Sequence, residues 1–504
     1  LVRATSYASG ATGGYGLTTT GGDFRELTDA INGFLSTSDG NNPTRSGSYY
    51  DDYSLNSLTV GQQVQLNMDG AADAYLQLIN AQTGAVIAYN DDSTPDYNSQ
   101  LTFTVQSGIN YLVRATSYAV GATGQYGLTT TAGKFASVPD NPGTIVPETY
   151  RPFNANQVFN LNSNSSANHT IYLDFNGHTT TGTAWNSNQS SIFTPAYDID
   201  GNSSSFSNTE RERIWRIWQR VAEDFSPFNV NVTTQAPSSD KLIKSSFGDT
   251  QWGVRVAIGG SSSDWLNGNF GGIAYLDSFN WNTDTPAFVF ENNLGNGNEK
   301  STAEAISHEV GHTLGLEHDG TFSVEYYAGH GSGATGWAPI MGNSYSRELT
   351  QWSRGEYSGA DNLENDLDII TGQNGFSYRA DDYADTLTNA AALAMSGGNV
   401  ETYGIIERNT DYDWFSFTTT GNINLSIDAF DRGPNLDILA RLYNASGQLV
   451  LYSNPIGSLS AGFSASLGAG QYYLSVTGTG QGSPSTGYSD YGSLGQYSIT
   501  GTIG

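Results

Sequence analysis

The chain has 504 residues, no cysteine and a formal net charge of −29 at neutral pH. The absence of thiols excludes disulfides and zinc–thiolate sites, and the excess of acidic residues argues against nucleic acid and anionic membranes as partners. A chain of this length predicts about three domains, and because no run of about 18 apolar residues occurs, no membrane-spanning helix is expected.

A repeat opens the chain. Residues 1–20 read LVRATSYASGATGGYGLTTT and residues 112–131 read LVRATSYAVGATGQYGLTTT, so only two of the twenty positions differ. The second copy closes a longer series of short strands, whereas nothing comparable precedes the first. We therefore expect residues 1–20 to be the tail strands of a truncated β-sandwich repeat, in a fragment or processed form of a longer protein. The alternative is a natural N-terminus whose strands only duplicate a hairpin.

The composition of the next segments predicts two linkers and a complete sandwich. Residues 21–50 are expected to be a linker that contains a short amphipathic helix at 24–35. Residues 51–131 contain short alternating strands separated by turn residues, which is typical of a β-sandwich. Residues 132–150 are rich in proline and glycine and predict a second linker.

A mixed set of strands and helices follows, from residue 151 to residue 375. Ser207 and Glu210 form a capping box, which predicts the start of a helix at 207–225. Apolar residues recur at helical spacing within it and predict one buried stripe, formed by Ile214, Ile217, Val221 and Phe225. Strands are predicted at 170–175, 228–233, 253–258 and 286–290.

An acidic loop lies between the first of these strands and the long helix. Asp198, Asp200 and Asn202 alternate in the sequence Asp-Ile-Asp-Gly-Asn, which has the oxygen-rich spacing of a calcium loop. The distal glutamate that completes such a loop is missing. A Ca²⁺ site and a plain acidic turn are therefore the two interpretations.

The most informative stretch begins at His308 and reads HEVGHTLGLEHD. His308 and His312 are four residues apart, so on a helix their rings lie on the same face. Gly315 allows a left-handed turn after the helix, which brings His318 round as a third ligand. Three neutral imidazoles leave one position of a tetrahedral Zn²⁺ ion open for water. Glu309 is placed to take a proton from that water, so the spacing predicts a catalytic zinc site.

The helix that carries these histidines is predicted to begin at a second capping box, formed by Ser301 and Glu304. Its apolar positions are expected to seat it on a core, and they are Ala305, Ile306, Val310, Leu314 and Leu316. The ligands are therefore expected on a rigid, buried support.

The extended motif resembles the metzincin zinc endopeptidases, and Asp319 after the third histidine resembles the reprolysin branch. In that family a methionine turn lies beneath the zinc, and the resemblance assigns this place to Met341 in Ala-Pro-Ile-Met-Gly. In some metzincins a tyrosine two residues after the methionine stabilises the transition state. Here Tyr345 follows Met341 by four residues, which departs from the family pattern.

The resemblance also implies a fold and a substrate contact. The order of strands and helices resembles a metzincin catalytic domain, an α+β fold with a mixed twisted sheet and the zinc-motif helix, over residues 151–375. In that family an edge strand above the cleft binds an extended peptide by main-chain hydrogen bonds. The residues that match this strand are Gly272, Ile273, Ala274 and Tyr275, and a simple glycine-rich hairpin is the alternative.

The pattern of the complete sandwich returns at the C-terminus, over residues 376–504. Asp-Asp-Tyr occurs at 51–53 and again at 381–383, and Gly-Gln-Tyr occurs at 124–126 and again at 495–497. Both segments resemble the bacterial pre-peptidase C-terminal domain, a small all-β sandwich appended to secreted proteases.

Together these features predict a secreted bacterial zinc endopeptidase that acts on protein or peptide substrates, with an α+β catalytic domain flanked by all-β sandwiches. Zn²⁺ is the expected cofactor, and the sandwiches are expected to contact a cell surface or matrix. The alternative is a surface-binding or adhesion protein that retains a catalytically silent protease fold. A further hypothesis is latency through an aspartate on the zinc, with Asp23 and Asp140 as candidates.

Overall fold

The computed structural model describes residues 29–35, 48–70, 73–80, 86–91, 98–107, 109, 111–119, 122–138, 147–151, 153–396 and 398–504. The expectations for residues 1–20, Asp23 and Asp140 lie outside these described residues. Within them the chain is mostly β-structure with few helices. It divides into two compact units, Leu1–Thr144 and Ile145–Gly504. None of the described helices is both long and apolar enough to cross a bilayer.

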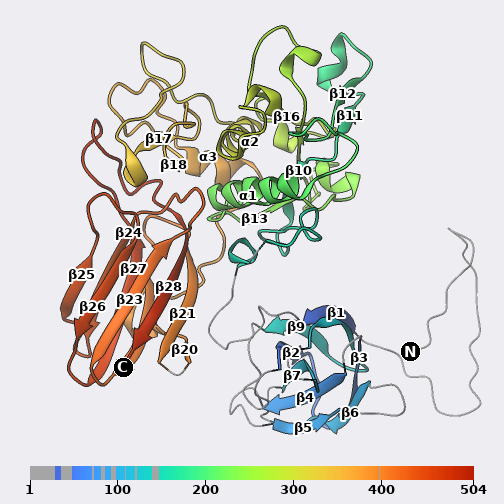
Figure 1. Ribbon diagram of the computed structural model, residues 1–504, viewed down its shortest axis with the longest axis vertical. Coiled ribbons are helices and arrows are strands. Elements are labelled where there is room, and N and C mark those ends of the chain that lie inside the picture. The colour runs from blue at the N-terminus through green and yellow to red at the C-terminus, as the bar shows by residue number, and fades with distance from the viewer. Residues whose placement is uncertain are drawn as a thin grey trace, which may run out of the picture. The chain divides into compact units, whose positions relative to one another are not determined.

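The first unit contains two β-sheets, drawn in blue in Figure 1. Their strands are β1 (Asp29–Leu35), β2 (Tyr50–Asn56), β3 (Gln63–Gly70), β4 (Ala74–Asn80), β5 (Val86–Asn90), β6 (Ser99–Thr104), β7 (Tyr111–Ser117), β8 (Gly124–Thr130) and β9 (Lys134–Val138). One sheet has the order β1-β8-β3-β6 and the other the order β5-β4-β7-β2-β9. Alternate residues of β3 (Val64, Leu66 and Met68) share one apolar core with Leu76 and Leu78 of β4. The two sheets therefore enclose a single core, as the alternation of apolar and polar residues predicts.

Both ends of this unit differ from the expected linkers. The helix expected at 24–35 is wrong for residues 29–35, which form β1 and pair antiparallel with β8. Ile31 and Leu35 are four residues apart, a spacing that places two side chains on one face of a helix and equally on one face of a strand. Residues 29–35 form a strand because they pair with an edge of β8. At the other end, β9 lies in the segment expected to be the second linker and pairs with β2.

The second unit contains a five-stranded sheet in the middle of the chain. Its strands are β10 (His169–Asp174), β13 (Val230–Thr233), β14 (Gly253–Ile258), β15 (Gly272–Ile273) and β16 (Ala287–Val289), in the order β13-β10-β14-β16-β15. Neighbouring strands are parallel except β15, which runs antiparallel to β16 at the edge. Four of these strands (β10, β13, β14 and β16) confirm the four predicted strands, with ends that differ by at most two residues.

Two helices, α1 (Asn208–Asp224) and α2 (Glu299–Thr313), pack against each other and against this sheet (Figure 1). The capping box predicted for α1 is confirmed, because the Ser207 side chain accepts from the backbone N–H of Glu210 and the Glu210 carboxylate accepts from that of Ser207. The predicted apolar stripe of α1 is buried against the core.

The start of α2 differs from the prediction. Its N-cap is Asn298, whose side chain accepts from the backbone N–H of Ser301. Glu304 pairs instead with Lys300 and accepts a hydrogen bond from the Ser344 hydroxyl. Two cap residues compete for the same helix start, and the earlier one adds a turn to the helix. The other elements of this α+β part (residues 147–375) are β11 (His178–Thr180), β12 (Ile192–Thr194), β17 (Trp337–Pro339), β18 (Leu349–Gln351) and α3 (Asp366–Gln373).

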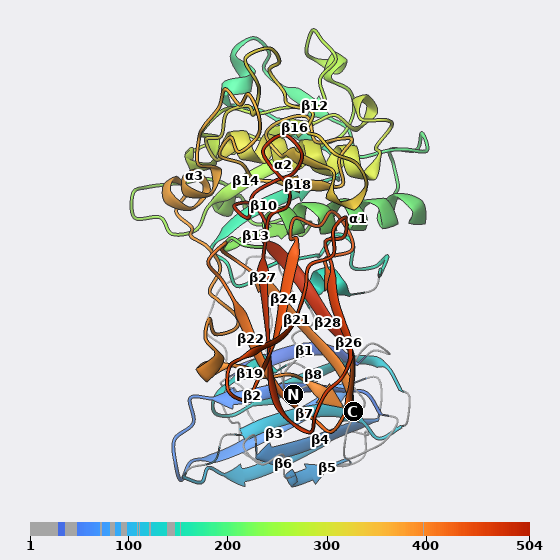
Figure 2. The same ribbon diagram turned by 90° about the vertical axis from the view of Figure 1, so that its left-hand side faces the viewer.

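Residues 376–504, called the C-terminal sandwich below, form two further five-stranded sheets, drawn in orange to red in Figures 1 and 2. The strands are β19 (Ala391–Ala392), β20 (Met395–Ser396), β21 (Asn399–Ile406), β22 (Asp413–Thr419), β23 (Asn422–Ala429), β24 (Ile438–Asn444), β25 (Leu449–Ser453), β26 (Ala461–Ser466), β27 (Gly470–Gly478) and β28 (Gly495–Ile503). The sheet orders are β19-β22-β27-β24-β25 and β20-β21-β28-β23-β26. β24 corresponds to β4, since each pairs with a hairpin partner that follows it and each has a register shift, between Leu442 and Tyr443 or between Leu78 and Ile79.

The C-terminal sandwich and the α+β part belong to one compact unit. The buried carboxylate of Glu223, near the end of α1, accepts from the backbone N–H and the side-chain amide of Gln496 in β28. Next to it, Asp224 accepts from the side-chain amide of Asn435. Figure 2 shows the ends of the sandwich strands reaching α1. The sandwich thus covers polar groups of the helix that would otherwise face water.

Candidate functional site

Three histidines converge at the C-terminal end of α2. His308 and His312 extend from the helix, and His318 extends from the segment after it. One ring nitrogen of each lies within 4.8 Å of those of the other two, and the Nε2 atoms of His312 and His318 are 3.0 Å apart. Nitrogens bound to one tetrahedral zinc ion at about 2.0–2.1 Å are roughly 3.3 Å from one another, so the three rings fit such an ion.

The Nδ1 atoms of the two helical histidines are already engaged by the backbone. His308 Nδ1 donates to the carbonyl of Ile340 at 3.0 Å, and His312 Nδ1 donates to that of Leu316 at 2.7 Å. Because a carbonyl only accepts, the proton lies on Nδ1 and each Nε2 keeps its lone pair. Burial lowers the pKa of His308 to about 3 and that of His312 to about 4, so both rings are neutral at neutral pH.

The third histidine is oriented by residues that the sequence does not single out. The Nδ1 atom of His318 lies 3.1 Å from Oε1 of Glu325. The ring of Tyr326 packs on that of His318 with centroids 4.3 Å apart. Both residues come from the loop beyond the motif, and no spacing relative to the histidines marks them in advance.

Glu309 lies beside the histidines and is only 7% exposed. Burial raises the pKa of its carboxyl to about 8. A β-carbon built on Gly272 would lie 2.5 Å from Cγ and 2.6 Å from Oε1 of Glu309. The carboxyl therefore rests directly on the backbone of the edge strand β15.

The chain leaves α2 through a left-handed turn. Gly315 has a φ of 103°, a conformation that glycine adopts at little cost, and its N–H donates to the carbonyl of His312. The backbone N–H of Leu316 donates to the carbonyl of Gly311. This turn returns the chain towards the helix and brings His318 to the other two histidines, as predicted from the glycine.

Met341 lies against the helix that carries the histidines and is completely buried. A β-carbon on Gly311 would overlap its sulfur atom, and the carbonyl of Met341 accepts from the backbone N–H of Asp319. The helix and Met341 are therefore in van der Waals contact. Gly311 is a further residue that the sequence does not single out, since the motif leaves this position unspecified.

A cleft of about 710 Å³ opens beside the three histidines. Its lining residues are Phe270, Gly272, Ile273, Ala274, Leu276, His308, Glu309, His312, Glu317, His318, Glu325, Tyr326, Asp361 and Asn362. Three of the four residues predicted for the substrate strand are thus at the cleft. The fourth, Tyr275, packs on Trp185 with ring centroids 4.1 Å apart.

The two tyrosines near the site differ in position. Tyr345 is 41% exposed, and it is not one of the residues that line the cleft. Its hydroxyl lies next to Gly271, and the partial burial of this end of the side chain, with Glu309 nearby, raises its pKa to about 12. Tyr326 lines the cleft and contacts the ring of His318. Of the two tyrosines, Tyr326 is therefore the one that lines the cleft and contacts a histidine.

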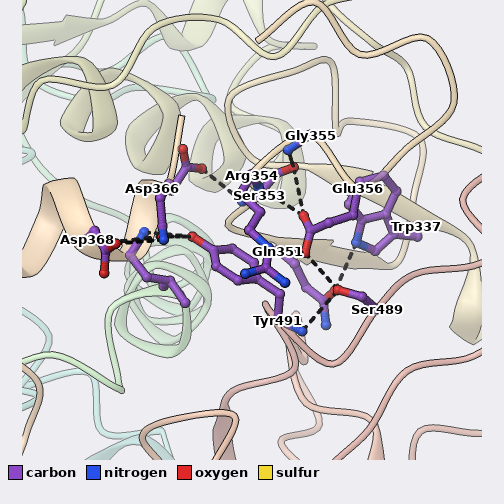
Figure 3. A network of polar contacts seen from close by, with 12 residues as sticks. Trp337, Gln351, Ser353, Arg354, Gly355, Glu356, Asp366, Asp368, Ser489 and Tyr491 are labelled. Atoms are coloured by element: carbon purple, nitrogen blue, oxygen red, sulfur yellow. Dashed lines mark hydrogen bonds and ion pairs between the residues drawn. The ribbon is translucent and has the colours of Figure 1, made fainter. Parts of the chain in front are cut away.

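The loop after Met341 is held by the C-terminal sandwich (Figure 3). The hydroxyl of Ser489 donates to Oε1 of Glu356 at 2.7 Å. The hydroxyl of Tyr491 donates to the side-chain oxygen of Asn365 at 2.6 Å and accepts from the backbone N–H of Leu367 at 2.9 Å. This segment also carries Asp361 and Asn362 of the cleft lining, so the sandwich supports one wall of the cleft.

The acidic loop at Asp198 forms a compact turn. The Oδ1 atom of Asp198 accepts hydrogen bonds from the backbone N–H groups of Asp200, Gly201 and Asn202. Carboxylate oxygens of Asp198, Asp200 and Glu210 lie within 4.8 Å of one another, but Glu210 is engaged in the capping box of α1. The Asn202 side chain bonds to Ser204 and Ser205 instead. A Ca²⁺ ion at these residues stays a prediction.

Comparison with protein families gives a match for residues 228–319, to the reprolysin-like metallopeptidases of family M12B. Comparison with curated proteins gives no match. Among solved structures, the pre-peptidase C-terminal domain of collagenase from Bacillus anthracis is 19% identical, with 22% of this chain and 91% of that chain covered and a TM-score of 0.17. PliG, a periplasmic inhibitor of g-type lysozyme from Aeromonas hydrophila, is 15% identical, with 20% of this chain and 82% of that chain covered and a TM-score of 0.16.

The matched segment begins just before β13 and ends at the aspartate that follows His318. It contains the edge strand β15, Glu309 and all three converging histidines. Residues 228–319 of the chain are thus similar to the reprolysin-like metallopeptidases of family M12B.

Proposed function

We propose that this protein is a zinc-dependent endopeptidase with His308, His312 and His318 as metal ligands and Glu309 as general base. The observation that carries the proposal is the convergence of three imidazoles beside a buried glutamate at an open cleft. The family match of the same segment supports it.

When bound, zinc lowers the pKa of water and polarises a peptide carbonyl. Glu309 takes the proton of the attacking water and delivers it to the leaving amine. Its rigid contact with Gly272 holds the carboxyl in one place, and its buried environment brings its pKa close to the working range of a group that accepts and releases a proton. No residue of the chain forms a covalent bond to the substrate in this scheme.

The edge strand β15 offers a place for the substrate backbone. β15 pairs with β16 on one side only, and Gly272, Ile273 and Ala274 line the cleft. An extended peptide that adds to this edge would be held by main-chain hydrogen bonds, whatever its side chains. Protein and peptide substrates follow from this arrangement.

The finer assignments belong to the same proposal. Residues 151–375 form a metzincin-like catalytic domain, and residues 51–131 and 376–504 form pre-peptidase C-terminal sandwiches. The protein is secreted by a bacterium, and the sandwiches contact a cell surface or matrix. Tyr326 replaces Tyr345 as the candidate for stabilising charge in the transition state, because it lines the cleft and packs on His318.

The test is hydrolysis of a denatured protein by the zinc-loaded chain, with the metal content measured in parallel. Glu309→Gln should retain zinc and lose about 10²–10⁴-fold in kcat, whereas Glu317→Gln, an exposed carboxylate of the same motif, should retain most of the activity. Equal activity of Glu309→Gln and the parent chain contradicts the assignment. A chain that binds zinc but cleaves no protein favours the alternative function of a surface-binding protein.

A further inference from the structure

Exposed apolar side chains are concentrated around the cleft. Nine large apolar or aromatic side chains are exposed among the described residues of the α+β part. Three of them line the cleft, namely Phe270, Leu276 and Tyr326. Phe322 and Val324 belong to the segment that leads to Tyr326, and Phe322 is 89% exposed. A single exposed apolar residue is ordinary on a protein surface, but a group of them beside a cleft is typical of an interaction site.

Phe322 and Val324 are held by a short hairpin, residues 320–326, called the rim hairpin below. The backbone N–H of Thr321 donates to the carbonyl of Val324 at 2.8 Å, and the N–H of Val324 donates to the carbonyl of Thr321 at 3.1 Å. Thr321 also forms a β-bridge with Ala360. Main-chain bonds therefore fix the hairpin, whereas the exposed ring of Phe322 at its tip contributes little to the stability of the fold.

The second arm of the rim hairpin leads into the proposed metal site. Glu325 lies against Nδ1 of His318, and the ring of Tyr326 packs on that of His318. Phe322 follows His318 by four residues in the sequence, so their Cα atoms are at most about 14 Å apart. An extended peptide rises about 3.3 Å per residue. A peptide whose scissile bond lies at the histidines therefore reaches the rim hairpin with a side chain about three to five residues away.

The edge strand β15 and the rim hairpin require different properties of a substrate. Addition to the edge requires an unpaired, extended backbone, and any amino-acid sequence meets this requirement. Burial of Phe322 and Val324 requires apolar side chains that gain free energy by leaving water. Folded proteins pair their backbone groups and bury most of their large apolar side chains. Both properties occur together in an unfolded segment of a protein.

We propose that Phe322 and Val324 form an apolar exosite that selects unfolded protein segments with large apolar side chains about three to five residues from the scissile bond. The exosite rests on the proposed peptidase function, because its ligand is the substrate of the same cleft. The rim hairpin continues into the cleft lining through Glu325 and Tyr326, and this continuity identifies the substrate as the occupant. Because the hairpin is already ordered, binding costs little further conformational entropy. A second copy of this chain is the competing occupant.

Binding is measured without catalysis, in the zinc-loaded full chain with Glu309→Gln. The probes are two fluorescent peptides of about 16 residues, long enough to span the cleft and the rim hairpin. One contains leucine at several positions along its length, and the other contains serine at these positions. The added substitutions Phe322→Ser and Val324→Ser should weaken binding of the leucine peptide about 10-fold and that of the serine peptide less than about twofold. An unchanged affinity for the leucine peptide, or an equal loss for both peptides, overturns the proposal.

Matched controls separate the exosite from other roles of the two side chains. Phe247→Ser removes an exposed ring of the α+β part that does not line the cleft, and it should leave both affinities unchanged. The double variant should keep the zinc content and the unfolding temperature of the Glu309→Gln chain, and a loss of either overturns the proposal. Sedimentation tests the competing occupant. Substitutions that dissociate a dimer but leave the peptide affinities unchanged identify a second copy of the chain as the occupant and overturn the proposal.

Catalysis is measured separately, in the chain that retains Glu309. Phe322→Ser with Val324→Ser should raise KM for the leucine peptide about 10-fold and leave kcat unchanged, because contacts far from the reacting bond stabilise the bound substrate and the transition state equally. A fall in kcat at unchanged KM overturns the exosite. A chain that shows the predicted binding difference but cleaves neither peptide supports the exosite and contradicts the proposed peptidase function, so the two failures are distinguishable.

Discussion

Gly272 and Glu309 are in direct contact across the floor of the cleft. The missing side chain of Gly272 leaves room for the carboxyl of Glu309, and a β-carbon there would lie 2.6 Å from Oε1. The strand proposed to hold the substrate and the group proposed to move the proton are therefore placed by one contact. A displacement of either one displaces the other.

Gly272→Ala should lower kcat/KM without loss of zinc. The added methyl group pushes the Glu309 carboxyl from its position, and a misplacement of about 1 Å in a catalytic group costs on the order of 10²-fold in rate. The measurement is peptide hydrolysis together with the zinc content of the purified chain. Ile273→Val in the same strand is the control and should remain near the parent activity. Full activity of Gly272→Ala would contradict this prediction, because it would show that the added methyl group does not displace the Glu309 carboxyl from its catalytic position.

Gly311→Ala should destabilise the protein, although alanine favours helices by about 1 kcal/mol relative to glycine. The added β-carbon overlaps the sulfur of Met341 in a fully packed region, and such overpacking costs about 1–3 kcal/mol. Urea unfolding of Gly311→Ala, Met341→Ala and the double variant measures the coupling. The double variant should be less destabilised than the sum of the two single variants. Additive effects would contradict a direct contact.

Glu325→Ala should weaken zinc binding. The carboxylate accepts the Nδ1 proton of His318 and so orients the ring for metal binding. Loss of such a partner typically costs 10–100-fold in metal affinity, and the exposure of Glu325 places the expected effect near the lower value, about 10-fold. Competition with a chromogenic chelator measures the affinity. Glu317→Ala, another carboxylate of the cleft lining, should leave the affinity within about twofold of the parent if the effect depends on the hydrogen bond to His318.

Tyr491→Phe should destabilise the contact between the C-terminal sandwich and the cleft wall. The change removes the acceptor for the buried N–H of Leu367 and the donor to Asn365, and an unsatisfied buried N–H costs about 1–3 kcal/mol. A lower unfolding temperature is the expected result. Tyr452→Phe, at an exposed position of β25, provides the comparison and should unfold with the parent.

The free energy of unfolding, measured with zinc but without Ca²⁺, should fall as the pH rises from 5 to 8.5. Burial raises the pKa of Glu223 to about 8 and that of Asp437 to about 7, so the folded protein binds more protons than the unfolded chain across this range. The favourable contribution of each group is complete below its unfolded pKa near 4 and is lost as the pH rises through the folded value. Urea unfolding at both ends of the range measures this, and Glu223→Gln should flatten the slope. Higher stability at pH 8.5 than at pH 5 would show that the two groups are not the determining ones.

Local patterns predicted those parts of the molecule whose geometry depends on neighbouring residues. The capping box at Ser207 predicted the start of α1, and the spacing from His308 to His318 with Gly315 predicted three rings at one place. The helix expected at 24–35 was wrong for its second half because Ile31 and Leu35 fit a strand as well as a helix, and pairing with β8 decides. At Ser301 the pattern was a valid cap, but Asn298 offered an equivalent one three residues earlier.

The amino-acid sequence by itself determined that three histidines converge beside a glutamate, because a helix repeats every 3.6 residues and places side chains on one face by spacing alone. Only the tertiary structure decided that Gly272 supports Glu309, that Glu325 and Tyr326 adjoin His318, and that the C-terminal sandwich holds the cleft wall. Such contacts depend on how separate elements pack, and no periodic pattern in the amino-acid sequence indicates that packing.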